Sequence, residues 1–304
     1  MASDSTRRRV HASSAVGGRV NADEAVLLWV DEYSRMAEAY EANVVPRFAP
    51  FAARLVERAG LPPNGMVLDV STGTGLTALL ASKANGGTGL VVAIDIADGA
   101  LHVAQTKAAR AGLRNLRFEM LDSRNIVYRG GSFDAALTSF GLPSIGHEQV
   151  LREVHRVLKE GASFHALGWA VRDPPSGWDA FEEVVAKHRS ASPSKVLAQL
   201  REAAEVVTKS GDTAAIQTPE ILTARLRAAG FSEVLARPHA EEVAFATLDD
   251  VVAFRGSWGT TERELAEMGD LAAFRADLTA RFEEYRTAEG YRFRWSVVYY
   301  DAKK

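Results

Sequence analysis

The sequence predicts an α/β fold with a seven-stranded, mostly parallel sheet and helices on both faces. Two observations lead to this prediction. From about residue 60 onward, short apolar segments alternate with segments of helical periodicity, which is typical of a parallel sheet. In addition, the segment MVLDVSTGTGLTALL, Met66 to Leu80, has the pattern of a buried strand, a glycine turn and a helix. The chain has 304 residues, of which 47% are hydrophobic, so it can bury a substantial core.

Seven apolar runs are short and rich enough in β-branched residues to form strands. They are Met66–Val70, Leu90–Asp95, Leu116–Leu121, Phe133–Phe140, Ser163–Trp169, Val234–Phe245 and Tyr291–Lys303. Four helices are expected between them: Leu76–Ala84, a helix capped by Asp98 that stops at Gly112, His147–Gly161, and Thr218–Phe231 with Thr218 as its cap.

Three regions flank or interrupt this alternation. Residues 1–20 are rich in Ser, Ala and Gly, lack periodicity, and are expected to be a disordered tail. Residues 21–60 form a helical arm that begins with a capping box of Asn21 and Glu24. The sheet domain, 61–304, carries helical cap insertions at about 174–217 and 247–289. We expect the cap to lie over the carboxyl ends of the strands, where ligands of such sheets bind.

Global composition limits the classes of function. The net charge of −3 indicates neither a nucleic-acid nor a membrane partner. The chain has no cysteine, which excludes disulfides and thiolate metal sites, and no metal site is expected. It contains no apolar span long enough to cross a bilayer and no apolar core of a secretory signal. We therefore expect a soluble cytoplasmic protein, monomer or homodimer, that acts on a small molecule.

The glycine turn satisfies a known ligand-binding pattern. Gly73-x-Gly75-x-x-Ala78 matches G-x-G-x-x-G/A, and Asp95 follows at about the expected distance of ~20 residues. The glycines allow a ligand to approach the backbone, and the helix start offers free N–H groups. An acidic residue after the second strand suits the two ribose hydroxyls. This pattern alone fits NAD and any other adenosine-containing ligand.

Three further features distinguish these ligands. Asp69, four residues before Gly73, would repel a pyrophosphate but suits a ligand that carries an ammonium and a sulfonium. Asp122 and Ser123 follow the third strand, where a carboxylate can accept from the adenine amine. No second mononucleotide-binding half follows the fifth strand. Together these features favour a cationic adenosine cofactor over NAD.

Five segments resemble a known family. VLDVSTGTG, AIDIA, LDS, FDAALTSF and LREVHRVLKEGA are similar, in order and spacing, to the signature segments of class I S-adenosylmethionine-dependent methyltransferases. The resemblance covers about Val67–Trp169 and is strongest to the group that includes ubiquinone/menaquinone-type and natural-product small-molecule methyltransferases. It implies a Rossmann-like fold and S-adenosylmethionine as cofactor. Gly168 stands where the quinone enzymes carry Glu, so a quinone substrate is not predicted.

The resemblance also implies which residues bind the cofactor. Asp69 and the turn would border the methionine part, Asp95 and Ile96 the ribose and adenine, and Asp122 with Ser123 the adenine amine. Ser139, after the fourth strand, would lie near the reactive methyl, and Tyr40 of the arm would close over the cofactor. The implied cofactor-binding set is Tyr40, Asp69, Ser71, Gly73, Gly75, Asp95, Ile96, Asp122, Ser123 and Ser139, with Ser71 replacing the usual glycine.

Residues on the acceptor side are less specific. His147 follows the fourth strand and is a weak candidate for a general base, because a structural histidine in the first turn of a helix is the favoured interpretation. Phe140, Trp169, Trp178 and Trp258 either wall a substrate pocket or pack in the core and cap. Trp258 lies between two glycines, Gly256 and Gly259, which suggests a mobile position.

These features lead to one hypothesis and two alternatives. The hypothesis is S-adenosylmethionine-dependent methyl transfer to a small, largely apolar metabolite by in-line displacement, on O, N or C. One alternative is an NAD(P)-dependent oxidoreductase that uses the same glycine turn. The other is a protein that binds S-adenosylmethionine without transferring a methyl group.

Overall fold

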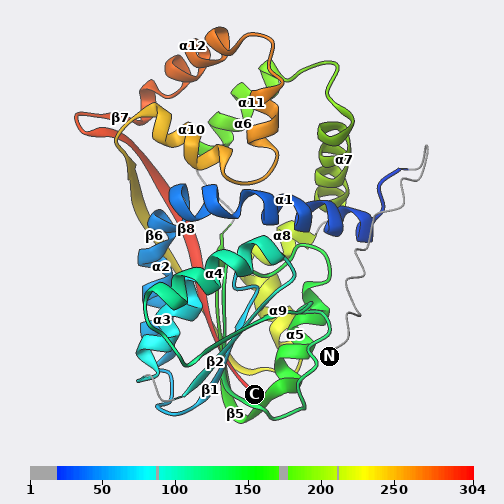
Figure 1. Ribbon diagram of the computed structural model, residues 1–304, viewed down its shortest axis with the longest axis vertical. Helices are drawn as coiled ribbons and strands as arrows, with labels where there is room; N and C mark the ends of the chain where they lie inside the picture. The colour runs from blue at the N-terminus through cyan, green and yellow to red at the C-terminus, as the bar shows by residue number, and fades with distance from the viewer. Residues whose placement is uncertain (1–18, 87–88, 171–176, 211) are drawn as a thin grey trace, which may run out of the picture.

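The computed structural model describes residues 19–86, 89–170, 177–210 and 212–304. Of the predicted tail, only Arg19 and Val20 belong to the described part, and the predicted insertion boundary at 174 lies outside it. The fold is α/β, with one mixed, mostly parallel sheet in the order β3-β2-β1-β4-β5-β8-β6, and a short β7 pairs with β8 (Figure 1). β8 runs antiparallel to its neighbours β5 and β6, whereas β1 to β5 pair in parallel.

The strands are β1 (Met66–Val70), β2 (Leu90–Asp95), β3 (Leu116–Met120), β4 (Phe133–Ser139), β5 (Leu158–Trp169), β6 (Ser232–Phe245), β7 (Arg286–Thr287) and β8 (Gly290–Lys303). The helices before β5 are α1 (Ala22–Asn43), α2 (Val45–Ala59), α3 (Leu76–Ala84), α4 (Asp98–Arg110) and α5 (His147–Val157). After β5 come α6 (Gly177–His188), α7 (Lys195–Lys209), α8 (Asp212–Gln217), α9 (Pro219–Ala228), α10 (Leu248–Gly256), α11 (Thr261–Ala266), α12 (Leu271–Arg281) and the 3₁₀ turn η1 (Glu283–Tyr285).

Alternate residues of the central strands face two different layers of helices. Val67 and Val91 pack with α2 and α3 on one face of the sheet. Leu68 and Val92, one residue further along, pack with α5 and α9 on the other. The central strands are therefore buried on both faces, and their carboxyl ends form the edge at which loops and ligands can meet.

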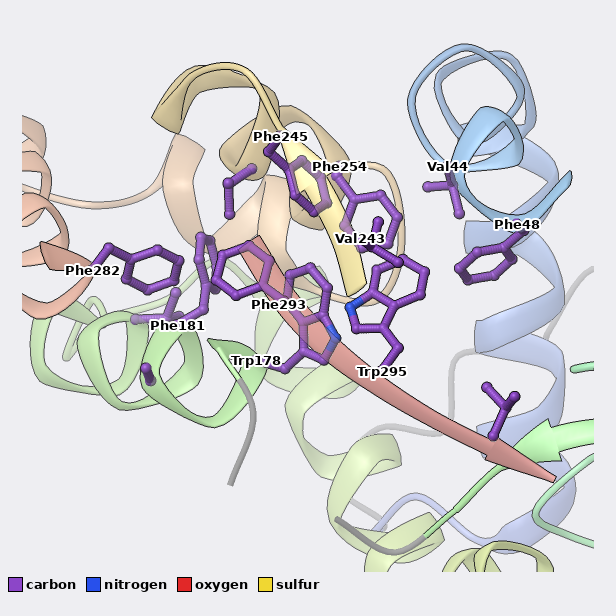
Figure 2. Packing of buried hydrophobic residues seen from close by; sticks show 14 of the residues in the cluster. Val44, Phe48, Trp178, Phe181, Val243, Phe245, Phe254, Phe282, Phe293 and Trp295 are labelled. Atoms are coloured by element: carbon purple, nitrogen blue, oxygen red, sulfur yellow. The ribbon is translucent and has the colours of Figure 1, made fainter. Parts of the chain in front are cut away.

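β6 and β8 extend beyond the other strands and carry the cap. Their pairing continues from Leu235–Asp301 in the sheet to Phe245–Tyr291 in the cap. The cap helices α6, α10, α11 and α12 gather around the cap end of this extended strand pair (Figure 1). Trp178, Phe254 and Trp295 belong to a large aromatic core there, which continues into α2 and β5 (Figure 2). The sheet and the cap thus share one hydrophobic core.

Helix α1 lies between the sheet and the cap (Figure 1). It packs on α4 and α7, and the contact with α4 requires a glycine. A Cβ atom at Gly99 would overlap the backbone carbonyl of Ser34 in α1. The capping box of Asn21 and Glu24 is present at the start of α1, as predicted. No helix in the described ranges is long and apolar enough to span a membrane.

Three local predictions were wrong. The helix predicted to end at Gly161 ends at Val157, because Leu158 is extended and pairs with Phe133 as the first residue of β5. Asp98 does not cap α4, since Ala97 occupies the cap position and the Asp98 carboxylate accepts from the adjacent Gly99 N–H. Thr218 is at the cap position of α9, but its hydroxyl donates backward to Ala214 instead.

Candidate functional site

The turn between β1 and α3 has the backbone geometry that a ligand cradle needs. Ser71, Gly73 and Gly75 all have positive φ, at 55°, 55° and 83°. A Cβ atom on Gly73 would meet nothing within 4 Å, so this residue faces open space. A Cβ atom on Gly75 would lie 2.8 Å from that of Ala104, so only glycine lets the turn approach α4. α3 begins directly after Gly75 without a side-chain cap, and the Ala78 N–H of its first turn acts on the Asp69 carboxyl.

Two carboxylates brace this turn. Asp95, at the end of β2, accepts from the Gly73 N–H at 2.8 Å and from the Ala97 N–H at 2.9 Å. Asp69, in β1, is 1% exposed and accepts from the Thr72 hydroxyl at 2.6 Å through Oδ2. Burial, and then the neighbouring Asp95, raise the pKa of Asp69 to about 7. Burial also raises the pKa of Asp95, against the effect of its backbone N–H donors.

Buried polar atoms without partners mark the same turn. Asp69 Oδ1 and Thr74 Oγ1 are shielded from solvent and have no hydrogen-bond partner among the described residues. Such atoms are costly unless another group satisfies them. A cationic ligand would satisfy Asp69, whereas an anionic one would be repelled by two carboxyl groups.

Five predicted residues line one small cavity of about 70 Å³. They are Ser71, Asp95, Ile96, Asp122 and Ser123, and Val26 of α1, Leu121, Arg124, Pro143 and Ile145 complete the wall. Sites for small molecules usually enclose roughly 300–1,000 Å³. A nucleoside can therefore enter only if the wall of the cavity opens. Two parts of the wall could move: Val26, through a shift of α1, and the long side chain of Arg124.

Arg124 was not predicted, and it changes how Asp122 is presented. Its guanidinium holds both oxygens of the Asp122 carboxylate, with Nη2 2.8 Å from Oδ2 and Nε 3.0 Å from the same atom. Burial would raise the pKa of Asp122, but the hydrogen bonds from Arg124 lower it. Asp122 is thus kept ionised and fixed in orientation. The only sequence signal for this pair is that two opposite charges lie two residues apart.

The loop after β4 contacts the glycine turn. A Cβ atom on Gly141 would lie 2.8 Å from the Cβ of Ser71, so the two loops touch here. Thr138 is buried and donates to the Val70 carbonyl at 3.0 Å, while Ser139 beyond it is partly exposed. Ser139 is therefore held beside the turn. Tyr40 of α1 packs edge-on against Phe48, with ring centroids 6.3 Å apart.

His147 does not line the cavity, although Ile145 in the loop before it does. It begins α5, its side chain is 1% exposed, and Nδ1 lies 3.3 Å from the carbonyl of Ser144 in its own loop. This geometry favours a structural role at the start of the helix. Within the described ranges, no three acidic or histidine side chains converge on a possible metal position.

Comparison with known proteins identifies the domain. The family described as "methyltransferase domain" matches residues 67–161, which contain the glycine turn, Asp95 and Asp122. The chain contains a class I S-adenosylmethionine-dependent methyltransferase domain. Ubiquinone/menaquinone biosynthesis C-methyltransferases are distant relatives of it: that of Blochmanniella pennsylvanica is 36% identical over 108 residues, and that of Ectopseudomonas mendocina 38% over 115 residues.

The similarity to these relatives is limited in extent. The alignments cover 35% and 37% of this chain, and the chain spans only 42% and 44% of the two relatives. The fold extends further, since the YcgJ protein from Bacillus subtilis superposes with a TM-score of 0.55 over 83% of this chain and 97% of its own, at 15% identity. The helices of the cap fall outside the part of the sequence that matches the family.

The residues of the methyltransferase domain fit its cofactor on structural grounds. The unpartnered Asp69 Oδ1 offers an acceptor for an ammonium, the open Gly73 leaves room beside the backbone, and the Asp95 carboxylate lines the adjoining cavity. A larger surface groove, about 480 Å³, lies between α5 and α9 and contains none of the predicted residues, so we do not assign it to the cofactor.

Proposed function

We propose that the chain is an S-adenosylmethionine-dependent methyltransferase that acts on a small, largely apolar metabolite. The observation that carries this proposal is the buried Asp69 carboxyl, whose Oδ1 has no hydrogen-bond partner among the described residues, beside the open glycine turn and Asp95. Two acidic groups suit a cofactor with ammonium and sulfonium charges and oppose the pyrophosphate of NAD(P). The family match over residues 67–161 supports the same assignment.

Each part of the site has a distinct binding task in this proposal. S-adenosylmethionine, when bound, supplies an electrophilic methyl group on a positively charged sulfur. Asp69 would hold its ammonium, Asp95 its ribose hydroxyls, and Ile96 would pack on its adenine, while Asp122 would accept from the adenine amine. Gly73, Gly75, Ser71 and Ser123 would let the ligand approach the backbone, with Ser139 near the methyl group and Tyr40 covering it from α1.

Alignment and exclusion of water, rather than proton removal, would account for the acceleration. An in-line displacement is accelerated by holding the nucleophile in contact with the methyl carbon. α1 and the cap would keep water from this contact. The buried position of His147 is consistent with a reaction that needs no histidine base. A substitution of His147 that lowers turnover without lowering stability would instead assign it the role of a general base.

The test is isothermal titration of the protein with S-adenosylhomocysteine and, separately, with NADH. We expect micromolar affinity for the first alone, and Asp95→Ala should weaken it at least tenfold. Binding of NADH alone would overturn the proposal in favour of an oxidoreductase. Tight binding of S-adenosylhomocysteine, with no release of it from S-adenosylmethionine for any member of an acceptor library, would instead indicate a protein that binds the cofactor without transferring methyl groups.

A further inference from the structure

Four aromatic rings meet at the carboxyl ends of β4 and β5. Phe48 comes from α2, Phe140 follows β4, Trp169 ends β5 and Trp258 follows α10 in the cap. We call them the aromatic quartet. Ring centroids are 4.8 Å apart for Phe48 and Phe140, 4.7 Å for Phe140 and Trp169, 5.9 Å for Phe48 and Trp258, and 6.5 Å for Trp169 and Trp258. Sheet, arm and cap therefore each contribute to one apolar cluster.

The quartet differs from the core beneath it. Phe48 is as buried as the core, at 3% exposed, but Phe140, Trp169 and Trp258 are only partly buried. Trp295, which contacts Trp169, and Phe254, which contacts Trp258, are 1% and 0% exposed. The Trp258 indole nitrogen is shielded from solvent and has no hydrogen-bond partner in the described part of the chain. The Trp295 indole nitrogen in the core is unsatisfied too, so what distinguishes Trp258 from it is the partial exposure of its side chain.

Phe140 has a strained backbone. Its φ is +55°, which is unusual for a bulky residue, and its N–H donates to the Leu167 carbonyl at 2.7 Å. Strain of this kind is found where a site must present a side chain in one direction. Here it turns the Phe140 ring toward Trp169, directly after Ser139 and next to the contact between Gly141 and Ser71. The quartet thus begins where the proposed cofactor site ends.

Two guanidinium groups lie near the quartet, those of Arg255 and Arg47, and the first of them is paired with Glu182. The Arg255 guanidinium lies 5.3 Å from the Trp258 ring centroid, and the Arg47 guanidinium lies 5.9 Å from that of Phe254. Phe254 packs on Trp258 at 5.5 Å. A cationic acceptor would be repelled by Arg47 as well as by the positive sulfur of the cofactor. A neutral, flat molecule would instead stack on the rings.

We propose that the aromatic quartet binds the methyl acceptor, and that the acceptor is a flat, conjugated molecule without positive charge. An oxygen or similar group on it would accept from the Trp258 N–H. This inference rests on the proposed function, because it takes the methyl group to lie beside Ser139. The rings are in contact in this structure, so the acceptor enters by separating Trp258 from Phe48 and Trp169. The glycines Gly256 and Gly259 leave space around that loop.

The test uses thioether probes that do not require the acceptor to be known. 5′-Methylthioadenosine and 5′-deoxy-5′-(2-naphthylmethylthio)adenosine share the nucleoside and differ in what extends from sulfur toward the acceptor side. By isothermal titration, the wild type should bind the naphthyl probe at least tenfold more tightly. A naphthyl probe with a protonated aminomethyl group should lose that gain. Equal affinity for the methyl and naphthyl probes, or tighter binding of the cationic one, would overturn the inference.

Substitutions test which residues cause the tighter binding of the naphthyl probe. Trp258→Ala and Phe140→Leu should each remove most of the preference for the naphthyl probe and change the affinity for 5′-methylthioadenosine less than twofold, which also verifies folding. A further probe that carries a carbonyl on the naphthyl ring should bind wild type more tightly than the plain naphthyl probe. Trp258→Phe should keep the preference for naphthyl but lose this extra affinity, because Phe has no N–H. Trp178→Phe is the matched control, because Trp178 stacks on Phe254 one layer deeper in the cap. A larger loss in Trp178→Phe than in Trp258→Ala would contradict the assignment.

The same titrations separate the two proposals. Wild-type protein that binds S-adenosylhomocysteine but shows no preference for the naphthyl probe would overturn the acceptor site alone. Protein that binds neither S-adenosylhomocysteine nor 5′-methylthioadenosine would overturn the proposed function, and the acceptor site with it.

Discussion

At the scale of single residues, the site depends on carboxylates whose environments differ. Asp69 is buried beside Asp95 and has a raised pKa, whereas Arg124 holds the carboxylate of Asp122 ionised. The ionised form of Asp69 is unfavourable in the free protein, and a cation would supply a partner for its Oδ1 atom. The carboxylate of Asp122 is already satisfied and serves as a fixed acceptor. At this edge of the sheet, Asp69 is thus stabilised when a cation binds, and Asp122 fixes the orientation of the ligand.

Asp69 should make both stability and binding depend on pH. An unfolded Asp ionises near pH 4 and the folded one near pH 7, so between these values the folded state holds more protons. The free energy of unfolding should therefore fall as pH rises from about 4 to 7, and Asp69→Asn should remove this decrease. At pH 8 the variant should be more stable than wild type by up to a few kcal/mol. Urea denaturation at several pH values measures this.

Binding should show the opposite dependence. A cationic cofactor needs the ionised carboxyl, so affinity for S-adenosylhomocysteine should rise between pH 6 and pH 8, by at most about tenfold per pH unit, with release of a proton. Titrations in two buffers of different ionisation enthalpy count that proton. Asp69→Asn should bind weakly at every pH. If wild-type affinity is constant over this range, Asp69 does not face the cation.

At the scale of elements, α1 is fastened to the cap by a buried ion pair. Glu32, 4% exposed, accepts from Arg263 of α11, with Nη2 2.9 Å away, and from Arg35 in its own helix. Nearby, Arg35 also pairs with Glu262 at the surface. α1 also contributes Val26 to the cavity wall, so opening the proposed cofactor site requires α1 to move. It can do so either by breaking the ion pair of Glu32 with Arg263 or by carrying the cap with it.

Glu32→Gln should loosen α1 far more than Glu262→Gln. Removing one member of a fully buried pair costs about 3–5 kcal/mol, whereas an exposed pair contributes about 0–1 kcal/mol. The loss in Glu32→Gln should lie between these values, because Arg263 is 27% and Arg35 40% exposed. The Glu32 side chain is 5% exposed and that of Glu262 is 50% exposed. We expect amide hydrogen exchange in α1 to accelerate at least tenfold in Glu32→Gln and S-adenosylhomocysteine to dissociate faster. Equal exchange rates in the two variants would show that the pair does not fasten the helix.

The sequence predicted the elements whose pattern is local. The strands from Met66 to Trp169 are apolar runs, and the glycine turn is recognisable from its spacing, so the carboxylates at the strand ends could be placed together. The boundary at Leu158 could not, because pairing with Phe133 overrides the helical pattern of that segment. The ion pair of Glu32 with Arg263 and the contact of Phe48 with Trp258 join segments that the sequence does not show to be neighbours. Arg124 is only two residues from Asp122, but its grip on that carboxylate depends on the conformation of the turn.

At the scale of the whole molecule, one strand pair connects the sheet to the cap. β6 and β8 stay paired from the sheet edge to Tyr291, and Trp295 lies midway along β8. Its ring centroid is 5.4 Å from Trp169 and 5.9 Å from Phe51 on the sheet side, and 5.5 Å from both Trp178 and Phe254 on the cap side. Because this side chain is 1% exposed and touches both parts, we expect the cap to be unable to unfold alone.

Trp295→Ala should weaken the sheet and the cap together. Truncating a buried aromatic side chain typically costs about 3–5 kcal/mol, through lost burial and the cavity left behind. Hydrogen exchange followed across a urea series should show α6 in the cap and β1 in the sheet losing protection at the same denaturant concentration, in wild type and variant alike, with the midpoint lower in the variant. Leu235→Ala is the control, since Leu235 is on the same strand pair but 50% exposed, and its midpoint should shift little. If α6 loses protection before β1 in the wild type, the cap is a separate folding unit and the shared core does not couple them. Coincident loss would mean that the sheet and the cap unfold as one cooperative unit, and that the aromatic quartet over β4 and β5 is part of it. An acceptor that separates the rings would then have to deform this unit, not merely displace a loosely attached lid.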